Sequence, residues 1–169
     1  MDAPDGGRKL VPLWDDNGNL LTPYTAQMPV IGITAEAVEA YCSYMSAKTA
    51  MKYRLPTALE WEKAARGVDG RDYVWGNEYH DDYARVNRSG QFSADNRPAA
   101  VGTYPYDCSV YGIFDLTGNA RELVTNPGNV QYYSVKGSSF NLSQRFARAS
   151  AHAYASNLSD VGFRCVVEP

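Results

Sequence analysis

The residues best suited to metal binding or nucleophilic chemistry are three cysteines and two histidines, and their spacing favours neither use. Cys42, Cys108 and Cys165 are far apart, and none belongs to a Cys-x-x-Cys pair, the spacing typical of zinc sites. His80 and His152 have no partner at ligand spacing. The odd number of widely spaced cysteines predicts buried or free thiols in a reducing compartment, not a disulfide framework.

Carboxylates and nucleophile motifs give no stronger catalytic signal. Asp81-Asp82 stands among loop residues without an acid–base partner, which favours a solvated turn. The sequence has neither a G-x-S-x-G elbow nor a Walker loop. Asp15, Asn17 and Asn19 alternate as in a calcium loop, but Leu20 stands where that loop needs glycine and no glutamate closes it. We therefore predict a hairpin turn there.

The composition is that of one soluble globular domain. The chain has 169 residues, of which 44% are hydrophobic and 21% charged, and this is enough for one core. The net charge of -3 argues against a nucleic-acid partner. The longest apolar runs are a few residues, so no membrane insertion is expected. Nothing after Met1 resembles a signal peptide, which favours a cytoplasmic location without fixing the compartment.

The first element expected to position these residues is a helix that begins after Thr34. A threonine is a favoured N-cap residue. Val38, Tyr41, Cys42 and Met45 follow the i, i+3, i+4, i+7 spacing of one buried stripe.

A second helix is predicted within "PTALEWEKAARG". Thr57 and Glu60 form a capping box, and Gly67 ends the helix. From Val68 to Tyr111 the chain is rich in Gly, Asp, Asn, Pro and Tyr, which predicts ordered but irregular backbone. Short strands are expected in "VYGIFDLTGNARELVTN", "VKGSSF" and the terminal "VGFRCVV", with a turn at 126–129. The core-facing residues expected in the second helix are Leu59, Trp61, Ala64 and Ala65.

Three segments carry a family resemblance: "YRLPTALEWEKAARGVDGRDYVWGNE", "VGTYPYDCSVYGIFDLTGNARELV" and the closing "KGSSF…VGFRCV". In this order they resemble the formylglycine-generating-enzyme (sulfatase-modifying factor) domain family, from about Pro29 to Val167. The resemblance implies an α+β protein with this family's variant of the C-type lectin fold: two helices, small twisted antiparallel sheets and extensive ordered loops. It also implies Trp61, Trp75 and Phe163 as core anchors, with Arg54 and Arg164 buried and paired.

The resemblance divides the chain into a domain at 29–169 and a hairpin-like N-terminal extension at 1–28. This extension is shorter than the family's usual beginning, so the chain is either cut from a longer polypeptide or a compact branch. The segment "EKAARGVDGR" is similar to versions attached to serine/threonine kinases, which implies an upstream domain in the same polypeptide.

The resemblance implies that the chain is not an enzyme. The family's oxidases bind copper(I) through two cysteines, and those positions fall at Leu142 and Ala147. No cofactor is required, although family members often hold a structural calcium around GN-x-x-E, here Asn119 and Glu122. A hydrogen-bonded turn without an ion is the alternative.

The C-terminal strip, residues 137–165, combines aromatic and small polar residues without a helical or strand period. These residue types are typical of binding loops, so we predict a surface for a protein or other macromolecule. Some proteins of this fold are variable proteins of diversity-generating retroelements, in which such a strip is rewritten by adenine-directed mutagenesis. From Ser138 to Val161 only Gln144 is a type that this rewriting does not produce. The predicted contact residues are Tyr132, Tyr133, Phe140, Asn141, Ser143, His152, Tyr154, Ser156, Asn157 and Asp160.

Two alternatives remain open. The domain could be a fixed regulatory or sensor module of a signalling protein such as a serine/threonine kinase. It could also be a copper-dependent oxidase, although the ligand cysteines are absent at Leu142 and Ala147.

Overall fold

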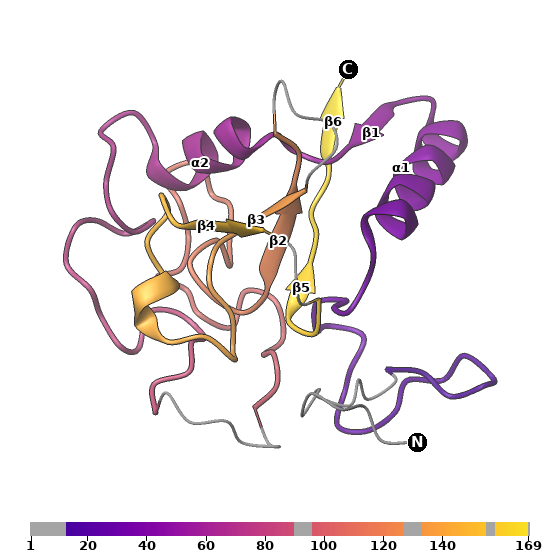
Figure 1. Cartoon of the computed structure of the whole chain (residues 1–169), viewed down its shortest axis with the longest axis horizontal. Coiled ribbons are helices and arrows are strands. Elements are labelled where there is room, and N and C mark those ends of the chain that lie inside the picture. The colour runs from indigo at the N-terminus through magenta and orange to yellow at the C-terminus, as the bar shows by residue number, and fades with distance from the viewer. Residues whose placement is uncertain (1–12, 90–95, 127–132, 155–157, 169) are drawn as a thin grey trace.

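The computed structural model describes residues 13–89, 96–126, 133–154 and 158–168. Its helices are α1 (Ala35–Thr49), α2 (Ala58–Arg66) and the short 3-10 helix η1 (Gln144–Phe146). Its strands are β1 (Lys52–Arg54), β2 (Arg121–Val124), β3 (Ser134–Lys136), β4 (His152–Tyr154), β5 (Val161–Gly162) and β6 (Val166–Glu168). The α+β class predicted from the sequence is confirmed (Figure 1).

Helix α1 begins where the sequence predicts, because the Thr34 hydroxyl accepts a hydrogen bond from the Ala37 backbone N–H. Its buried stripe is narrower than predicted, since only Val38 and Cys42 are buried. Tyr41 is 44% exposed, and its ring meets the edge of Phe163 with centroids 5.4 Å apart. The helix packs on β1, and Val38 and Cys42 also reach residues of the four-stranded sheet.

Helix α2 has the predicted capping box and ends at Gly67. Trp61 and Ala65 face the core as expected, whereas Leu59 is 70% exposed, so that prediction is wrong. Two residues along a helix correspond to a rotation of about 200°. Leu59 therefore lies on the side opposite Trp61.

The strands form a two-stranded sheet, β1-β6, and a four-stranded sheet in the order β4-β3-β2-β5. All pairs are antiparallel except β2 and β5, which run parallel. The terminal strand expected in "VGFRCVV" is in fact two strands, because residues 163–165 carry the chain from one sheet to the other. Of the turn expected at 126–129, all but Asn126 lies outside the described residues.

The main core cluster lies between α1 and the four-stranded sheet. The Sγ atoms of Cys42 and Cys165 are 3.7 Å apart at its edge. Trp61 is the anchor of a second cluster, whereas Trp75 and Phe163 are half-buried and pack against the clusters. The buried members of the main cluster are Val38, Cys42, Leu55, Leu123, Val135 and Val161.

The segment 68–111 is irregular, as predicted, in the part of it that the structure describes. Aromatic contacts order it: Tyr73 stacks on Trp75, and Tyr83 lies between His80 and Tyr106, with 4.3 Å between centroids on each side. The predicted hairpin turn near the start of the chain is also present. There the Asp15 carboxylate accepts hydrogen bonds from Asn17 and Asn19 backbone N–H groups.

Candidate functional site: the C-terminal strip

Burial divides the C-terminal strip into a supporting layer and an outer layer. Phe140 and Asp160, both predicted to contact a ligand, are only 4% and 2% exposed. Phe140 packs with Ile31 and Ala120, and Asp160 pairs with Arg121. These two predictions are corrected: a side chain enclosed in this way supports the surface from below and is not available to a macromolecule.

Strand β4 carries the outer layer. It forms the edge of the four-stranded sheet, and all three of its residues, His152–Tyr154, are exposed. Tyr154 is 73% exposed and pairs in register with Ser134, while His152 pairs with Lys136. Because β3 is buried throughout, β4 presents exposed side chains on a rigid base.

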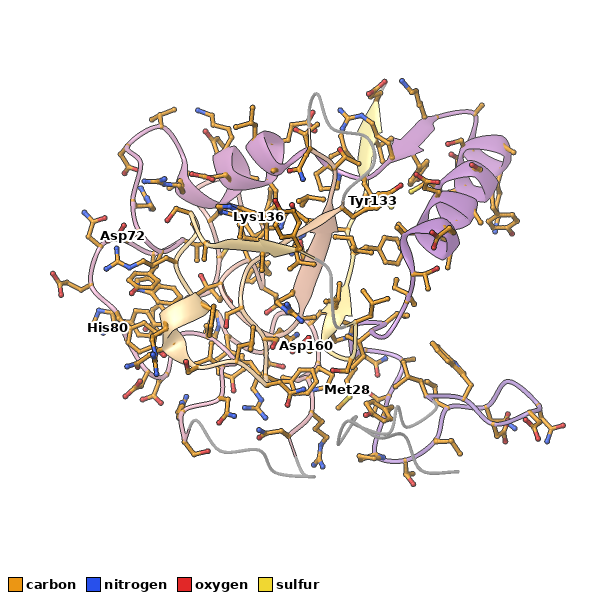
Figure 2. All side chains as sticks on the ribbon, viewed as in Figure 1. Met28, Asp72, His80, Tyr133, Lys136 and Asp160 are labelled. Carbon is orange, nitrogen blue, oxygen red and sulfur yellow. The ribbon has the colours of Figure 1, made fainter. Side chains whose placement is uncertain are left out.

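A network of buried polar contacts fixes the layer beneath β4. Lys136 is 2% exposed, and its ammonium group is 3.0 Å from the Glu62 carboxylate and lies over the Trp61 ring. The Ser139 hydroxyl donates to the second oxygen of Asp160. Lys136 and Asp160, both 2% exposed, are labelled in Figure 2. Buried polar groups that have hydrogen-bond partners favour one arrangement.

The first turn of the strip is held by its backbone. The Asn141 N–H donates to the Ser139 hydroxyl, and the Leu142 carbonyl accepts from the Asn87 N–H at 2.9 Å. Asn141, Ser143 and Leu142 are half-buried.

Phe146, at the end of η1, is 48% exposed and was not among the predicted contacts. Its neighbour Ala147 is fully buried. A small residue directly after a large aromatic one is the sequence signal that could have placed Phe146 on the exposed side.

The Tyr133 side chain contacts helix α1. Its hydroxyl donates to the Glu39 carboxylate on α1, and its ring packs against the main core cluster (Figure 2). This contact raises the pKa of Tyr133 to about 12. Tyr133 therefore joins β3 to α1 and does not extend the β4 surface. The other three candidates, Tyr132, Ser156 and Asn157, lie outside the described residues.

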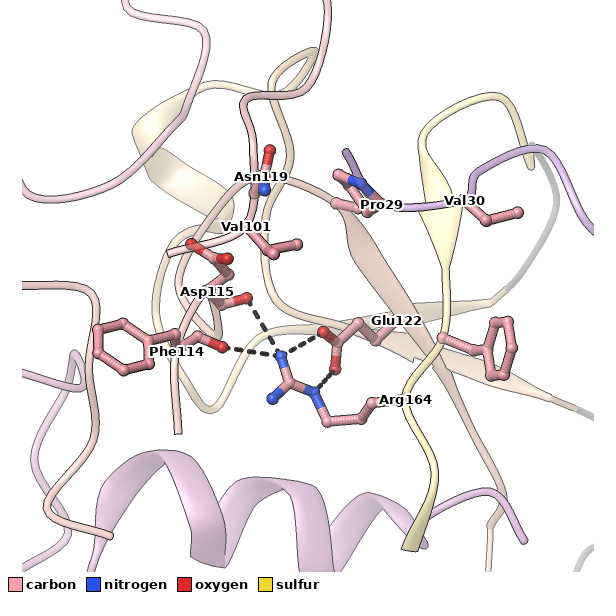
Figure 3. A pocket seen from close by; sticks show the side chains of 10 residues that line it. Pro29, Val30, Val101, Phe114, Asp115, Asn119, Glu122 and Arg164 are labelled. Atoms are coloured by element: carbon pink, nitrogen blue, oxygen red, sulfur yellow. Dashed lines mark hydrogen bonds and ion pairs between the residues drawn. The ribbon is translucent and has the colours of Figure 1, made fainter. Parts of the chain in front are cut away.

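The two residues predicted to hold calcium line a cavity of about 400 Å³ (Figure 3). Both oxygens of Glu122 are occupied: Trp61 Nε1 donates at 2.6 Å, and Arg164 donates through Nε and Nη2. The Asn119 amide exchanges two hydrogen bonds with the Ala99 backbone. A calcium ion needs free oxygen ligands, and an adjacent guanidinium repels it, so these donors do not fit the ion. No described residues form a cluster of three acidic, histidine or cysteine side chains suited to a metal.

Arg54 and Arg164, which the family resemblance implies to be buried and paired, both have carboxylate partners, and Glu122 is the partner of Arg164. Arg164 also donates to the Phe114 carbonyl, and Arg54 pairs with Glu60 and Glu168. Both side chains are about 30% exposed, so they are partly and not fully buried.

The fully buried Asp107 gives a prediction for pH dependence. Burial raises its pKa to about 7, although the Thr117 and Gly118 backbone N–H groups donate to its two oxygens and favour ionisation. The unfolded carboxyl ionises near pH 4. Between about pH 4 and 7 the folded chain therefore keeps a proton that the unfolded chain has lost, and stability falls as the pH rises through this window.

The measurement is urea unfolding at a series of pH values. Asp107→Asn should flatten the decline between pH 4 and 7, whereas Asp16→Asn, on the exposed turn, should leave it unchanged. A decline that is the same in both variants would mean that Asp107 is ionised in the folded chain.

Comparison with known proteins identifies the family of this chain. Residues 14–169 match the sulfatase-modifying factor enzyme 1-like domain. The chain is similar to hercynine oxygenase of Mycobacterium tuberculosis, with 39% identity over 106 residues, covering 60% of this chain and 23% of that protein. It is also similar to inactive C-alpha-formylglycine-generating enzyme 2 of Mus musculus, with 27% identity over 158 residues, covering 82% and 49%.

A third relative is serine/threonine-protein kinase pkn1 of Chlamydia caviae, with 31% identity over 117 residues, covering 69% of this chain and 16% of that protein. The chain thus spans less than half the length of each of these relatives. No helix among the described residues has the length and apolar character that crossing a bilayer requires.

The fold is shared with Treponema denticola variable protein 1, with a TM-score of 0.73 at 18% identity, covering 93% of this chain and 77% of that one. The predicted family and fold are confirmed: the chain belongs to the sulfatase-modifying factor enzyme 1-like domain family and has its C-type lectin-like fold.

Proposed function

We propose that this domain is a non-catalytic binding module that presents the outer layer of its C-terminal strip to a protein or other macromolecule. The observation that carries this proposal is β4: His152 and Tyr154 are exposed at the edge of a sheet whose next strand is buried. An exposed tyrosine on a rigid base can bury a large area at little entropic cost. Phe146 on η1 adds a second exposed ring within the same strip.

The absence of thiols at Leu142 and Ala147 supports a non-catalytic role, as does the similarity to an inactive formylglycine-generating enzyme. Ala147 is buried among Tyr73, Ala84 and Val86, so a methyl group fills this position within a packed core. A copper(I) ion would need two soft ligands there.

Copper(I) titration tests the catalytic alternative, and we expect no stoichiometric copper binding at the strip. The Cys42–Cys165 thiol pair is a separate possible ligand set, so the double variant Cys42→Ser/Cys165→Ser is the control. Any copper bound by the wild-type chain should be lost in that variant. Tight one-to-one binding that persists in it would contradict a non-catalytic strip.

Sequencing the encoding gene from many independent isolates tests the binding role, including retroelement diversification. If the strip is rewritten to change its ligand, substitutions should gather at exposed and half-buried positions such as Ser143, His152 and Tyr154. They should be rare at the buried positions of the same strip, because changes there unfold the domain. A strip as constant as the core would contradict diversification. The buried positions are Ser138, Ser139, Phe140, Ala147, Ala149 and Asp160.

A constant strip would favour the second candidate, a fixed regulatory module, which the similarity to a kinase supports. A kinase domain encoded upstream in the same reading frame would identify that arrangement.

A further inference from the structure

A second cavity, of about 220 Å³, lies outside the outer layer of the strip and has a different chemistry. Its described lining consists of Arg85, Val86, Asn87, Arg88, Ser89, Asn96 and Tyr104. Two of these residues are cationic and none is acidic, although the whole chain has a net charge of -3. Positive charge concentrated in a concave site attracts anions even when the protein is acidic overall.

The cavity has hydrogen-bond donors that the protein does not use. The Asn96 side-chain nitrogen is buried without any hydrogen-bond partner. Arg85 donates from Nη1 to the Val86 carbonyl at 3.3 Å, and its side chain makes no other hydrogen bond within the described residues. A buried donor without a partner costs free energy. An acceptor bound in the cavity would remove that cost.

Within the described residues, Arg88 has one ion pair, and this contact is easily exchanged. Its Nη2 is 3.0 Å from the Asp82 carboxylate, but the two side chains are 48% and 85% exposed. Ion pairs exposed to this extent contribute little to stability because water and salt screen them. Arg88 can therefore release Asp82 and bind a ligand at little cost to the fold.

The walls of the cavity are fixed by backbone hydrogen bonds. The Arg85 carbonyl accepts from the Asn119 N–H at 2.8 Å, and the Asn87 N–H donates to the Leu142 carbonyl. Gly118 also packs so closely on Arg85 that an added Cβ would lie 2.7 Å from its carbonyl oxygen. The two guanidinium groups thus project from a preorganised segment, which lowers the entropic cost of binding.

We propose that this cavity binds a tetrahedral oxyanion, namely a phosphate or sulfate group, through Arg85, Arg88 and Asn96. Guanidinium groups match the oxygens of such an anion and form strong charge-assisted hydrogen bonds with it. The neutral amide of Asn96 adds a donor. This site is independent of the proposed function, although it adjoins the first turn of the strip through the contact between Asn87 and Leu142.

The test is a titration of the whole chain with inorganic phosphate, and in parallel with sulfate, followed by NMR of backbone, Asn side-chain and Arg Nε–H groups. Potassium chloride at matched ionic strength is the control anion. We expect saturable shifts at Arg85, Arg88 and Asn96 with the tetrahedral anions but not with chloride. The anion that binds more tightly identifies the natural group.

Matched variants make the outcome decisive. Arg88→Gln and Arg85→Gln should each weaken binding about tenfold, and Asp82→Asn should strengthen it because a competing carboxylate is removed. Lys63→Gln changes the charge equally at an exposed position on α2 outside the cavity, and should have little effect. Equal weakening by Lys63→Gln, or shifts that chloride reproduces, would overturn the proposal, since either result indicates non-specific attraction.

Discussion

Glu122→Gln is expected to lower the free energy of unfolding by about 3–5 kcal/mol, because it leaves the partly buried Arg164 guanidinium without its counter-charge. Glu122 is 8% exposed and accepts hydrogen bonds from both Arg164 and Trp61. Glutamine keeps one oxygen acceptor, but its NH2 group replaces the second oxygen and faces the N–H donors of Arg164 or Trp61. Urea denaturation at neutral pH, with the slope compared between variants, gives the difference directly.

The matched control is Glu60→Gln, the same chemical change in an ion pair with Arg54 that is more exposed. This variant should lose only about 1 kcal/mol, from its capping box and a screened ion pair. If both variants lost the same stability, burial of the Glu122–Arg164 pair would not be what makes it important.

Phe140→Ala is the second large effect that we expect, with a loss of about 3–5 kcal/mol. Phe140 is 4% exposed and fills the space between Ile31 and Ala120, so its removal leaves a cavity. Tyr154→Ala, at a side chain that is 73% exposed, should change stability by less than about 1 kcal/mol. Thermal and urea unfolding of the two variants measure this contrast.

Phe146→Ala provides the control, because it removes the same ring from a position that is 48% exposed. It should resemble Tyr154→Ala. A stable Phe140→Ala variant would restore Phe140 as a candidate contact residue, and an unfolded Tyr154→Ala variant would place Tyr154 in the core instead of on the binding surface.

Both helices could be predicted from the sequence because their signals are local. Thr57 and Glu60 interact across three residues, and the hydroxyl of Thr34 caps the helix that directly follows it. Leu59 could not be placed in the same way. Leu59 and Trp61 are two positions apart and therefore lie on opposite sides of the helix, and only the tertiary packing decides which of these two sides is covered.

The division of the strip into buried and exposed residues could not be predicted, because burial there depends on partners that are distant in the sequence. Asp160 is buried because it meets Arg121, 39 residues earlier, and Phe140 because it meets Ile31. Similarly, the Asn119 and Glu122 side chains suit calcium by type, yet Arg164, 42 residues later in the chain, pairs with the Glu122 carboxylate. Residue type indicates which interactions are available, but the chain's topology selects among them.

The contact between Cys42 and Cys165 means that the domain's resistance to unfolding can depend on its surroundings. Their Sγ atoms are 3.7 Å apart and 123 residues apart in sequence, so a covalent bond would tie α1 to the chain just before β6. Closing a loop of this length disfavours the unfolded chain by about 4–5 kcal/mol. Burial raises the pKa of Cys165 to about 12, which leaves little thiolate at neutral pH and slows oxidation. The tether would therefore form only under sustained oxidising conditions, and the reduced domain relies on its noncovalent contacts.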